Sequence, residues 1–399
     1  NPVANVDCDP NNPATFAECG VVFIGMTDAD GDFLNYTIDV LSLELETANG
    51  RIVETLPQTT RINFTDYVDL TELVAAAHIP PATYVAGTIR IDYTNAEVFV
   101  EANGESKQAV VMNDLGEILT QTELTIQLSD RDQLRITKGR AALLQLDFDL
   151  DASHAVDIVP TPADVVTEQF IIAEVFPVDE KDIRVRGPLV SVDQTEMTYT
   201  VALRPFHDRH GDFGQVTVHV TNSTEFEVNE TLSVGVEGLQ ALEDAGPGTP
   251  TVAAGIFNVA EREFTAYMVL AGTSVPGFYR DAVVGNVIKR DGNFLAIRGA
   301  TIIPWDRRAH FHDDVVVEVG PETKVFRDGY RHSDLEIGAI SIGQRVTIHG
   351  AQAGTPTTDA SAPQILFDAT QGVVRMHLTR LSGIVNTVMQ GQTEITLHG

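Results

Sequence analysis

The chain has 399 residues, with 57 Asp and Glu against 26 Lys and Arg, so its formal net charge is −31 at pH 7. Nucleic acids and anionic membranes attract clustered basic residues, and the chain contains only five Lys, so the composition excludes both as expected partners. Hydrophobic residues make up 43% of the chain and charged residues 21%, which is typical of a folded protein of roughly two to four domains.

The chain begins at Asn1 instead of Met and has no basic, apolar leader, which predicts that an N-terminal segment was removed during export. No uninterrupted apolar run approaches the roughly 18 residues that a membrane-spanning helix needs. We therefore expect a secreted or cell-surface protein without a transmembrane segment.

Residues 1–19 are predicted to form an N-terminal arm that carries both cysteines of the chain, Cys8 and Cys19. An isolated pair this close in sequence is typical of a small disulfide loop in an oxidising compartment. Closing such a loop would contribute roughly 3 kcal/mol by the chain-entropy argument. Two free thiols, or a link to another chain, are the alternatives.

An acidic turn follows the first apolar segment. Asp28, Asp30 and Asp32 place three carboxylates at alternate positions, with Gly31 available for the turn. The pattern resembles the start of a calcium loop, although the bidentate Glu that completes an EF-hand loop is missing. We expect either a calcium site that stiffens the turn or a solvated turn between two strands.

Apolar and polar residues alternate along most of the chain. Leu144, Leu146 and Phe148, for example, alternate with Gln145 and Asp147. This period of two predicts strands with one buried face, and therefore an all-β protein.

One short helix is predicted over residues 70–77, because Asp69 can cap it, Glu72 falls at the capping-box position and Pro80 stops it. Apart from this helix, residues 20–160 are predicted to form a β-sandwich-like domain. Residues 161–182 are predicted to be a linker.

The second half of the chain repeats itself with a period of about 98 residues. The segment 205–224 matches the segment 304–323, Gly187 matches Gly285, and Gly383 starts the pattern again. A unit of this size is a complete small domain, and its five or six strands suit a barrel of the oligonucleotide/oligosaccharide-binding (OB) shape. We expect OB-like β-barrels over residues 183–277 and 278–375. Residues 376–399 would start a third repeat that continues beyond Gly399.

The sandwich-like region resembles a family of secreted bacterial lipoprotein domains, domain of unknown function 4382, over residues 20 to about 155. The resemblance rests on short structural motifs: Met26, Thr27 and Asp28; Val40, Leu43, Glu44 and Leu45; Val68, Asp69 and Leu70; Ile79, Pro80, Ala82, Thr83 and Tyr84. It implies a secreted or surface-anchored bacterial protein and carries no catalytic residue.

The repeats from about residue 183 onward are similar to another bacterial extracytoplasmic module, domain of unknown function 5666. The similarity rests on a Gly-x-Val strand start and on Thr224, Thr323, Ile342, Gly343, Val346 and Gly350. The first repeat departs from the pattern over residues 235–239. This resemblance implies modular β-domains at the cell surface, again without a catalytic residue.

Two polar clusters in the repeats contain candidate ligands for a transition metal. They comprise His207, Asp208, His210 and Asp212 in the first repeat and His310, His312, Asp313 and Asp314 in the second. Imidazole and carboxylate groups suit zinc or copper, and His310 and His312 would share one face of an extended strand. The histidines do not occupy corresponding positions in the two repeats, so polar loop tips without a metal are the alternative.

Trp305 is the only tryptophan, and it corresponds to Phe206 of the preceding repeat. Because exposed aromatic rings commonly line sugar-binding grooves, Trp305 is a candidate glycan-binding residue. A repeated core or hairpin position is the alternative.

No catalytic motif stands out, since the sequence has no Gly-x-Ser-x-Gly elbow, no His-Glu-x-x-His and no phosphate loop. We therefore expect a non-enzymatic structural or interaction protein outside a bacterial cell. Its expected partners are copies of itself or other cell-surface components, in an extracellular assembly or filament, and calcium is the one expected cofactor. A glycan- or metal-binding surface module is the alternative. A secreted hydrolase is a third interpretation, because the abundant carboxylates would hide a glycosidase pair.

Overall fold

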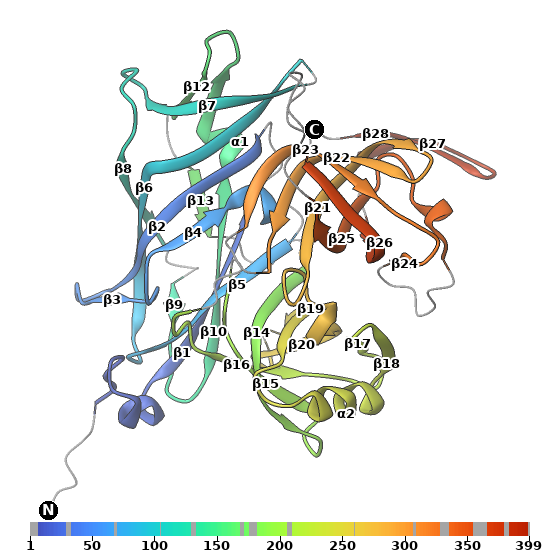
Figure 1. Cartoon of the computed structure of the whole chain (residues 1–399). Coiled ribbons are helices and arrows are strands. Elements are labelled where there is room, and N and C mark those ends of the chain that lie inside the picture. Colours follow the sequence, from blue (N-terminus) through green and yellow to red (C-terminus); the bar gives the residue numbers. More distant parts are fainter. Residues whose placement is uncertain are drawn as a thin grey trace, which may run out of the picture. The chain divides into compact units, whose positions relative to one another are not determined.

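The computed structural model describes residues 7–28, 33–67, 70–103, 105–128, 133–167, 171–174, 182–205, 210–258, 260–305, 309–327, 335–353, 365–378 and 383–397 (Figure 1). Strands dominate these residues, which confirms the predicted all-β class. The chain divides into two compact units, Asn1–Val275 and Pro276–Gly399, and each is described by itself.

The N-terminal arm contains a 3₁₀ helix, η1 (Pro13–Glu18). The Asn12 side chain caps this helix by accepting a hydrogen bond from the Ala14 N–H at 3.2 Å. Pro13 suits the first helical position, where its missing N–H costs nothing.

Two β-sheets of the first unit share one hydrophobic core, as predicted for a sandwich. One sheet contains, in spatial order, β13 (Ile171–Glu174), β10 (Ala141–Asp149), β1 (Gly20–Asp28) and β5 (Leu70–Ile79). The other contains β11 (His154–Asp157), β12 (Ala163–Thr167), β7 (Glu105–Asn113), β6 (Thr83–Ala102), β2 (Phe33–Thr47) and β3 (Ile52–Glu54). Three shorter strands join the second sheet, β4 (Thr60–Asn63), β8 (Gln121–Gln127) and β9 (Leu134–Arg135). The short helices η2 (Phe64–Tyr67) and α1 (Leu150–Ser153) connect these strands.

The long strand β2 shows why the sequence forms this sheet. Tyr36, Ile38 and Val40 are buried in the core, and Thr37 and Asp39 between them lie on the more exposed face. This period of two matches the pleat of a strand with one face in the core. β2 pairs along its length with β6.

The helix predicted over residues 70–77 is wrong, because these residues belong to strand β5. β5 pairs with β1 on one edge and with β14 (Asp182–Asp193) on the other, and residues 71–76 are all buried. Apolar and polar residues do not alternate in a strand that is covered on both faces. The alanine-rich sequence of β5 therefore lacked the pattern of a strand and was interpreted as a helix. Pairing with two neighbours outweighs the weak preference of alanine for helices.

The segment 161–182, predicted to be a linker, instead contributes two strands to the first unit. β12 runs parallel to β7, and β13 runs antiparallel to β10. Both strands are short, so neither shows enough alternation to be recognised in the sequence. The pairing of Asp182–Arg184 in β14 with Leu70–Glu72 in β5 then links the sandwich to the first barrel.

The first barrel closes through the strand order β14, β15 (Thr198–Ala202), β16 (Gln215–His219), β20 (Glu263–Ala271) and β19 (Pro250–Asn258), because β19 pairs back with β14. Of these five neighbouring pairs, β16–β20 alone is parallel. This is the predicted OB-like arrangement. The remaining elements of this repeat are β17 (Glu225–Val228), β18 (Thr231–Val234), α2 (Val236–Ala245) and η3 (Gly272–Ser274). Residues 235–239, where the repeat departs from its pattern, lie at the start of α2 and not on a barrel strand.

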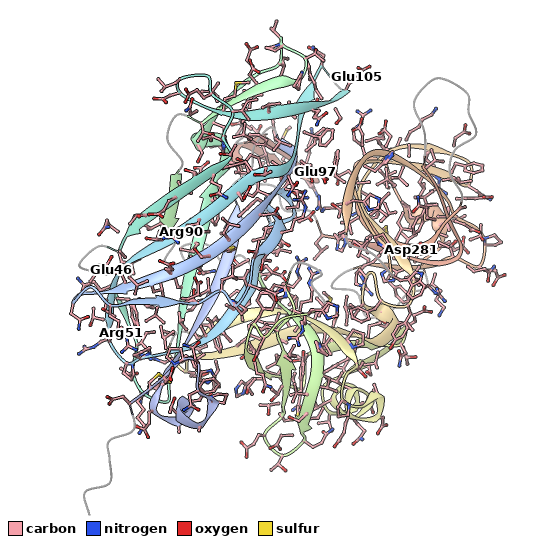
Figure 2. All side chains as sticks on the ribbon, turned by 60° about the vertical axis from the view of Figure 1, so that its left-hand side comes forward. Glu46, Arg51, Arg90, Glu97, Glu105 and Asp281 are labelled. Carbon is pink, nitrogen blue, oxygen red and sulfur yellow. A yellow bond between two sulfur atoms is a disulfide. The ribbon has the colours of Figure 1, made fainter. Side chains whose placement is uncertain are left out.

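The second barrel repeats this topology in the second unit. Its strand order is β21 (Asp281–Asp291), β22 (Phe294–Ile303), β23 (His310–Glu318), β26 (Ile365–Met376) and β25 (Arg345–Gln352), and β25 pairs back with β21. The β23–β26 pair is the parallel one, as in the first barrel. Figure 2 shows this ribbon as a closed ring, with Asp281 labelled on it. β24 (Lys324–Arg327) and η4 (Ile337–Ala339) lie between β23 and β25 in sequence.

A final hairpin completes the described part of the second unit. It consists of β27 (Gly383–Met389) and β28 (Gln392–Leu397), which form a separate two-stranded sheet (Figure 1).

Candidate functional site

A disulfide joins Cys8 and Cys19 in the N-terminal arm, with an S–S distance of 2.04 Å. Cys19 is buried, and its carbonyl oxygen accepts a hydrogen bond from the Gly139 N–H at 2.9 Å. The Phe16 ring stacks on His78 at the end of β5, with ring centroids 3.9 Å apart. The disulfide loop is therefore attached to the sandwich, and it has a structural role.

The acidic turn at Asp28, Asp30 and Asp32 is only partly described. Asp28 is the last residue of β1, and Asp30 and Asp32 lie outside the described residues. Calcium binding at these three residues stays a prediction.

The first histidine cluster is also only partly described. His207 lies outside the described residues. His210 is exposed, and its carbonyl oxygen accepts a hydrogen bond from Gln58 Nε2 at 3.4 Å. This contact ties the loop of the first barrel to the sandwich.

The second cluster lies on strand β23. His310, His312 and Asp314 occupy one face of the strand, and Asp313 occupies the face that is buried further along β23. The Nδ1 atom of His312 lies 3.0 Å from the Asp314 carbonyl oxygen, and the Asp314 carboxylate pairs with Arg298 at 3.4 Å. Within the described ranges, no three His, Cys, Asp or Glu side chains gather to hold a metal ion. A transition-metal site stays a prediction.

Trp305 lies at one end of the second barrel, and its side chain is not part of the core. Its exposed fraction is 56%, and its backbone N–H donates a hydrogen bond to Asp281 Oδ1 at 3.0 Å. Asp281 Oδ2 accepts a second hydrogen bond, from the Gln352 N–H at 3.1 Å. Tyr279 and Phe278, just before Asp281, are 66% and 37% exposed. This barrel end therefore presents aromatic rings to solvent.

A buried charge centre that was not predicted from the sequence lies at the junction of the sandwich and the first barrel. Glu72 on β5 is fully buried, and its carboxylate pairs with Arg184 and with Arg186 Nε, the latter at 3.2 Å. The Arg184 guanidinium also lies over the Tyr67 ring, 5.6 Å from its centroid. Burial, together with the Glu72 charge, raises the pKa of Tyr67, so its hydroxyl stays protonated. The pattern Arg-x-Arg on a strand was the only available signal, and it does not identify a partner.

This charge centre is specific to the first barrel. At an offset of 98 residues, the positions of Arg184 and Arg186 are occupied in the second barrel by Ala282 and Val284. The first strand of the second barrel thus lacks the two cations that bind Glu72. The first barrel belongs to the same compact unit as the sandwich, and the second barrel belongs to the other unit.

Two histidines, His154 and His349, are buried in the protein interior. The His154 Nδ1–H donates to the Leu150 carbonyl at 2.8 Å, and Nε2 accepts from the Tyr36 hydroxyl at 2.9 Å. Burial lowers the pKa of His154 to about 4. In the second barrel, burial and then the neighbouring Arg375 lower the pKa of His349 to about 3. Both rings are therefore neutral at pH 7.

The β27–β28 hairpin has the same strand register as the first hairpin of each barrel. Val385 pairs with Ile395, at positions that correspond to Val287 and Ile297 in the second barrel. A bulge follows Val385 as it follows Val287. The first barrel has the equivalent pair, Leu189 opposite Val201, again followed by a bulge. The hairpin therefore reproduces the first two strands of a barrel.

The chain was compared with family models, with curated proteins and with solved structures, and none of them matches it. The resemblances to the two bacterial domain families stay predictions. In the part of the chain that the structure describes, no helix is both long and apolar enough to span a membrane.

Proposed function

We propose that this protein is a non-enzymatic structural and interaction protein, secreted or held at the surface of a bacterial cell, that forms part of an extracellular assembly. One observation carries the proposal: the same hairpin, with the same bulge, occurs three times in series. Serial modules of one topology are suited to spacers and assemblies, in which each unit repeats the same contacts.

The buried ionisable groups support this proposal. The Glu72 carboxylate forms ion pairs with two arginines, and His154 is held on both ring nitrogens by groups of the protein itself. Buried ionisable groups serve either chemistry or the fold, and the partners of these two groups belong to the fold. The net charge of −31 would keep exported modules soluble until a specific contact forms.

Electron microscopy of the native material tests the proposal directly. We expect filaments, layers or defined particles that contain many copies, and images of purified chain at increasing concentration should show the same contacts. Native material that consists only of isolated monomers would contradict the assembly role. A hydrolytic activity that copurifies with the chain would contradict the non-enzymatic role.

A glycan-binding surface is the second candidate, and it is favoured by the exposed rings of Trp305, Tyr279 and Phe278. Sugars stack on exposed aromatic faces, and Trp305 would report such stacking by its fluorescence because it is the only tryptophan. Titration with a panel of oligosaccharides should shift the emission of the natural protein. The Tyr279→Ala variant, which keeps Trp305, should weaken the response. No shift with any oligosaccharide removes this candidate.

A further inference from the structure

The chain passes from the first compact unit to the second at Val275 and Pro276. Two units of one chain move relative to each other by default, unless something restrains the joint between them. The stiffness of the connecting segment therefore decides whether such a protein acts as a rigid spacer or as a flexible string. In this chain the segments on both sides of the joint are held by their own units.

On the side of the first unit, the turn between β17 and β18 holds η3, the last element before the joint. The Asn229 N–H donates to the Ala271 carbonyl at 3.1 Å, and Asn229 Oδ1 accepts a hydrogen bond from the Thr273 N–H at 3.1 Å. The Glu230 N–H donates to Ser274 Oγ at 2.8 Å. We call these three hydrogen bonds the latch. They fix η3 to a hairpin of the first barrel.

The latch depends on an unusual backbone conformation. Asn229 and Glu230 both have positive φ angles, 51° and 62°, and Gly272 has a φ of 64°. Residues with a side chain disfavour this left-handed region, glutamate included. A Cβ atom on Gly272 would overlap Asn229 Oδ1, so only glycine allows the turn to approach η3 this closely. Both segments therefore have the backbone that the latch requires.

On the side of the second unit, the chain is held from Gly277 onward. Gly277 has a φ of 74°, and a Cβ atom there would overlap Ile303 Cγ2 on β22. Further along, Asp281 Oδ1 accepts the hydrogen bond from the Trp305 N–H. The first residues of the second unit thus lie against their own barrel. Only Val275 and Pro276 separate the two held segments.

These two joint residues have little conformational freedom. The proline ring fixes the φ of Pro276, and it excludes the helical region for the residue before it. Val275 is that residue, and its β-branched side chain restricts it further. Its φ of −83° and ψ of 126° lie in the extended region that proline imposes on its predecessor.

We propose that the joint at Val275 and Pro276 is stiff, and that the latch keeps it stiff by holding η3 on the first unit. The two units then move together instead of swinging about the joint. The inference goes beyond the proposed function, because it concerns the mechanics of one chain and needs no second copy. In an extracellular spacer, a stiff joint sets a fixed distance between successive modules.

Double electron–electron resonance on the full chain tests the stiffness. The two natural cysteines are joined to each other, so Gln240→Cys on α2 and Lys289→Cys on β21 add one exposed spin-label site to each unit. We expect a single narrow distance distribution. Inserting about four glycines between Val275 and Pro276 gives the reference for a free joint, and it should widen the distribution at least about twofold. A natural chain whose distribution is as broad as that reference overturns the proposal.

The double variant Asn229→Gly, Ser274→Ala tests the latch in the same labelled chain. Glycine keeps the positive φ of the turn and removes the side-chain acceptor, and alanine removes the Ser274 hydroxyl. We expect a clearly broader distribution. The matched control is Asn222→Gly, Ser223→Ala, which makes the same two substitutions in the exposed turn before β17 and should leave the distribution narrow. Equal widths for the two double variants overturn the role of the latch.

A third variant keeps the test decisive if the latch variant does not fold, which far-UV circular dichroism detects. Pro276→Gly leaves every hydrogen bond of the latch in place and frees the backbone of the joint. We expect it to broaden the distance distribution as well. A distribution as narrow as that of the natural chain would contradict the restricted joint.

Images of the native material separate this inference from the proposed function. A stiff joint in a chain that occurs only as isolated monomers leaves the inference standing and removes the assembly role. A freely moving joint in a chain that forms filaments or layers removes the inference and leaves the assembly role standing.

Discussion

Glu72 Oε1 and Arg186 Nε lie 3.2 Å apart in the interior of the first unit, where a strand of the sandwich meets the first strand of a barrel. Glu72 is fully buried, and Arg184 binds the same carboxylate from the same strand as Arg186. A buried carboxylate is tolerated only because these cations compensate for its lost hydration. The junction therefore depends on all three charges being present.

Removing the charge of Glu72 should strongly destabilise the first unit. Glu72→Gln removes the fully buried carboxylate with which both Arg184 and Arg186 pair, and we expect the free energy of unfolding in urea to fall by about 3–5 kcal/mol. The control is Glu123→Gln, which breaks an exposed pair with Arg90 Nε at 2.8 Å and should change stability by less than about 1 kcal/mol. Figure 2 labels Arg90 on β6. Equal effects of the two variants would show that the junction does not need its charge.

Reduction of the disulfide should destabilise the arm and its attachment to the sandwich. Cys8 and Cys19 are 11 residues apart, and opening a loop of this length lowers the free energy of unfolding by roughly 3 kcal/mol in the chain-entropy argument. Thermal melts with and without dithiothreitol measure the effect. With and without dithiothreitol, the double variant Cys8→Ser, Cys19→Ser should melt at the temperature at which the natural protein melts in dithiothreitol. If dithiothreitol does not change the melting temperature of the natural protein, the disulfide contributes nothing to its stability.

Acid should destabilise the first unit through His154. The folded-state pKa is about 4 and the ordinary value is 6.5, so the unfolded state binds the proton more tightly. The stabilising contribution of the neutral ring is complete above pH 6.5 and is lost as the pH falls to about 4. The loss is on the order of 3 kcal/mol. Urea unfolding at several pH values should show this slope, and His154→Gln should flatten it. An unchanged slope in the variant would assign the acid sensitivity to other groups.

A side chain at Gly187 should disrupt the first barrel. A Cβ atom there would lie 1.9 Å from the Ala202 carbonyl oxygen on the paired strand. Because backbone on both strands must move, we expect Gly187→Ala to lower the free energy of unfolding by about 1–3 kcal/mol or more. Gly338→Ala is the control, since nothing lies within 4 Å of its Cβ position. Equal stabilities of the two variants would mean that the barrel accommodates the methyl group freely.

The sequence predicted the strands that have one buried face and one exposed face. Alternation at Leu144, Leu146 and Phe148 indicated β10. The sequence repeat in which Gly187 corresponds to Gly285 located the two barrels. Alternation failed for β5, where both faces are covered and the two-residue period disappears. It also failed for β12 and β13, which are too short to show a period.

The candidate sites could be predicted only in part, for a related reason. Cys8 and Cys19 are close in sequence, so their pairing was open to inference. Glu72 and Arg184 are 112 residues apart, and only the parallel pairing of β5 with β14 brings them together. Such a contact depends on topology, which local spacing does not contain. The significance of Val385 likewise required the register of the finished barrels.

The shared strand β14 limits how this protein can be rearranged. Its first residues extend the sandwich sheet, and its remainder closes a barrel. A gene fragment that ends before the first barrel would leave β5 with a bare edge and Glu72 without Arg184 and Arg186. Recombination can therefore exchange whole barrels further along the chain, but the sandwich and its adjoining barrel must be inherited together.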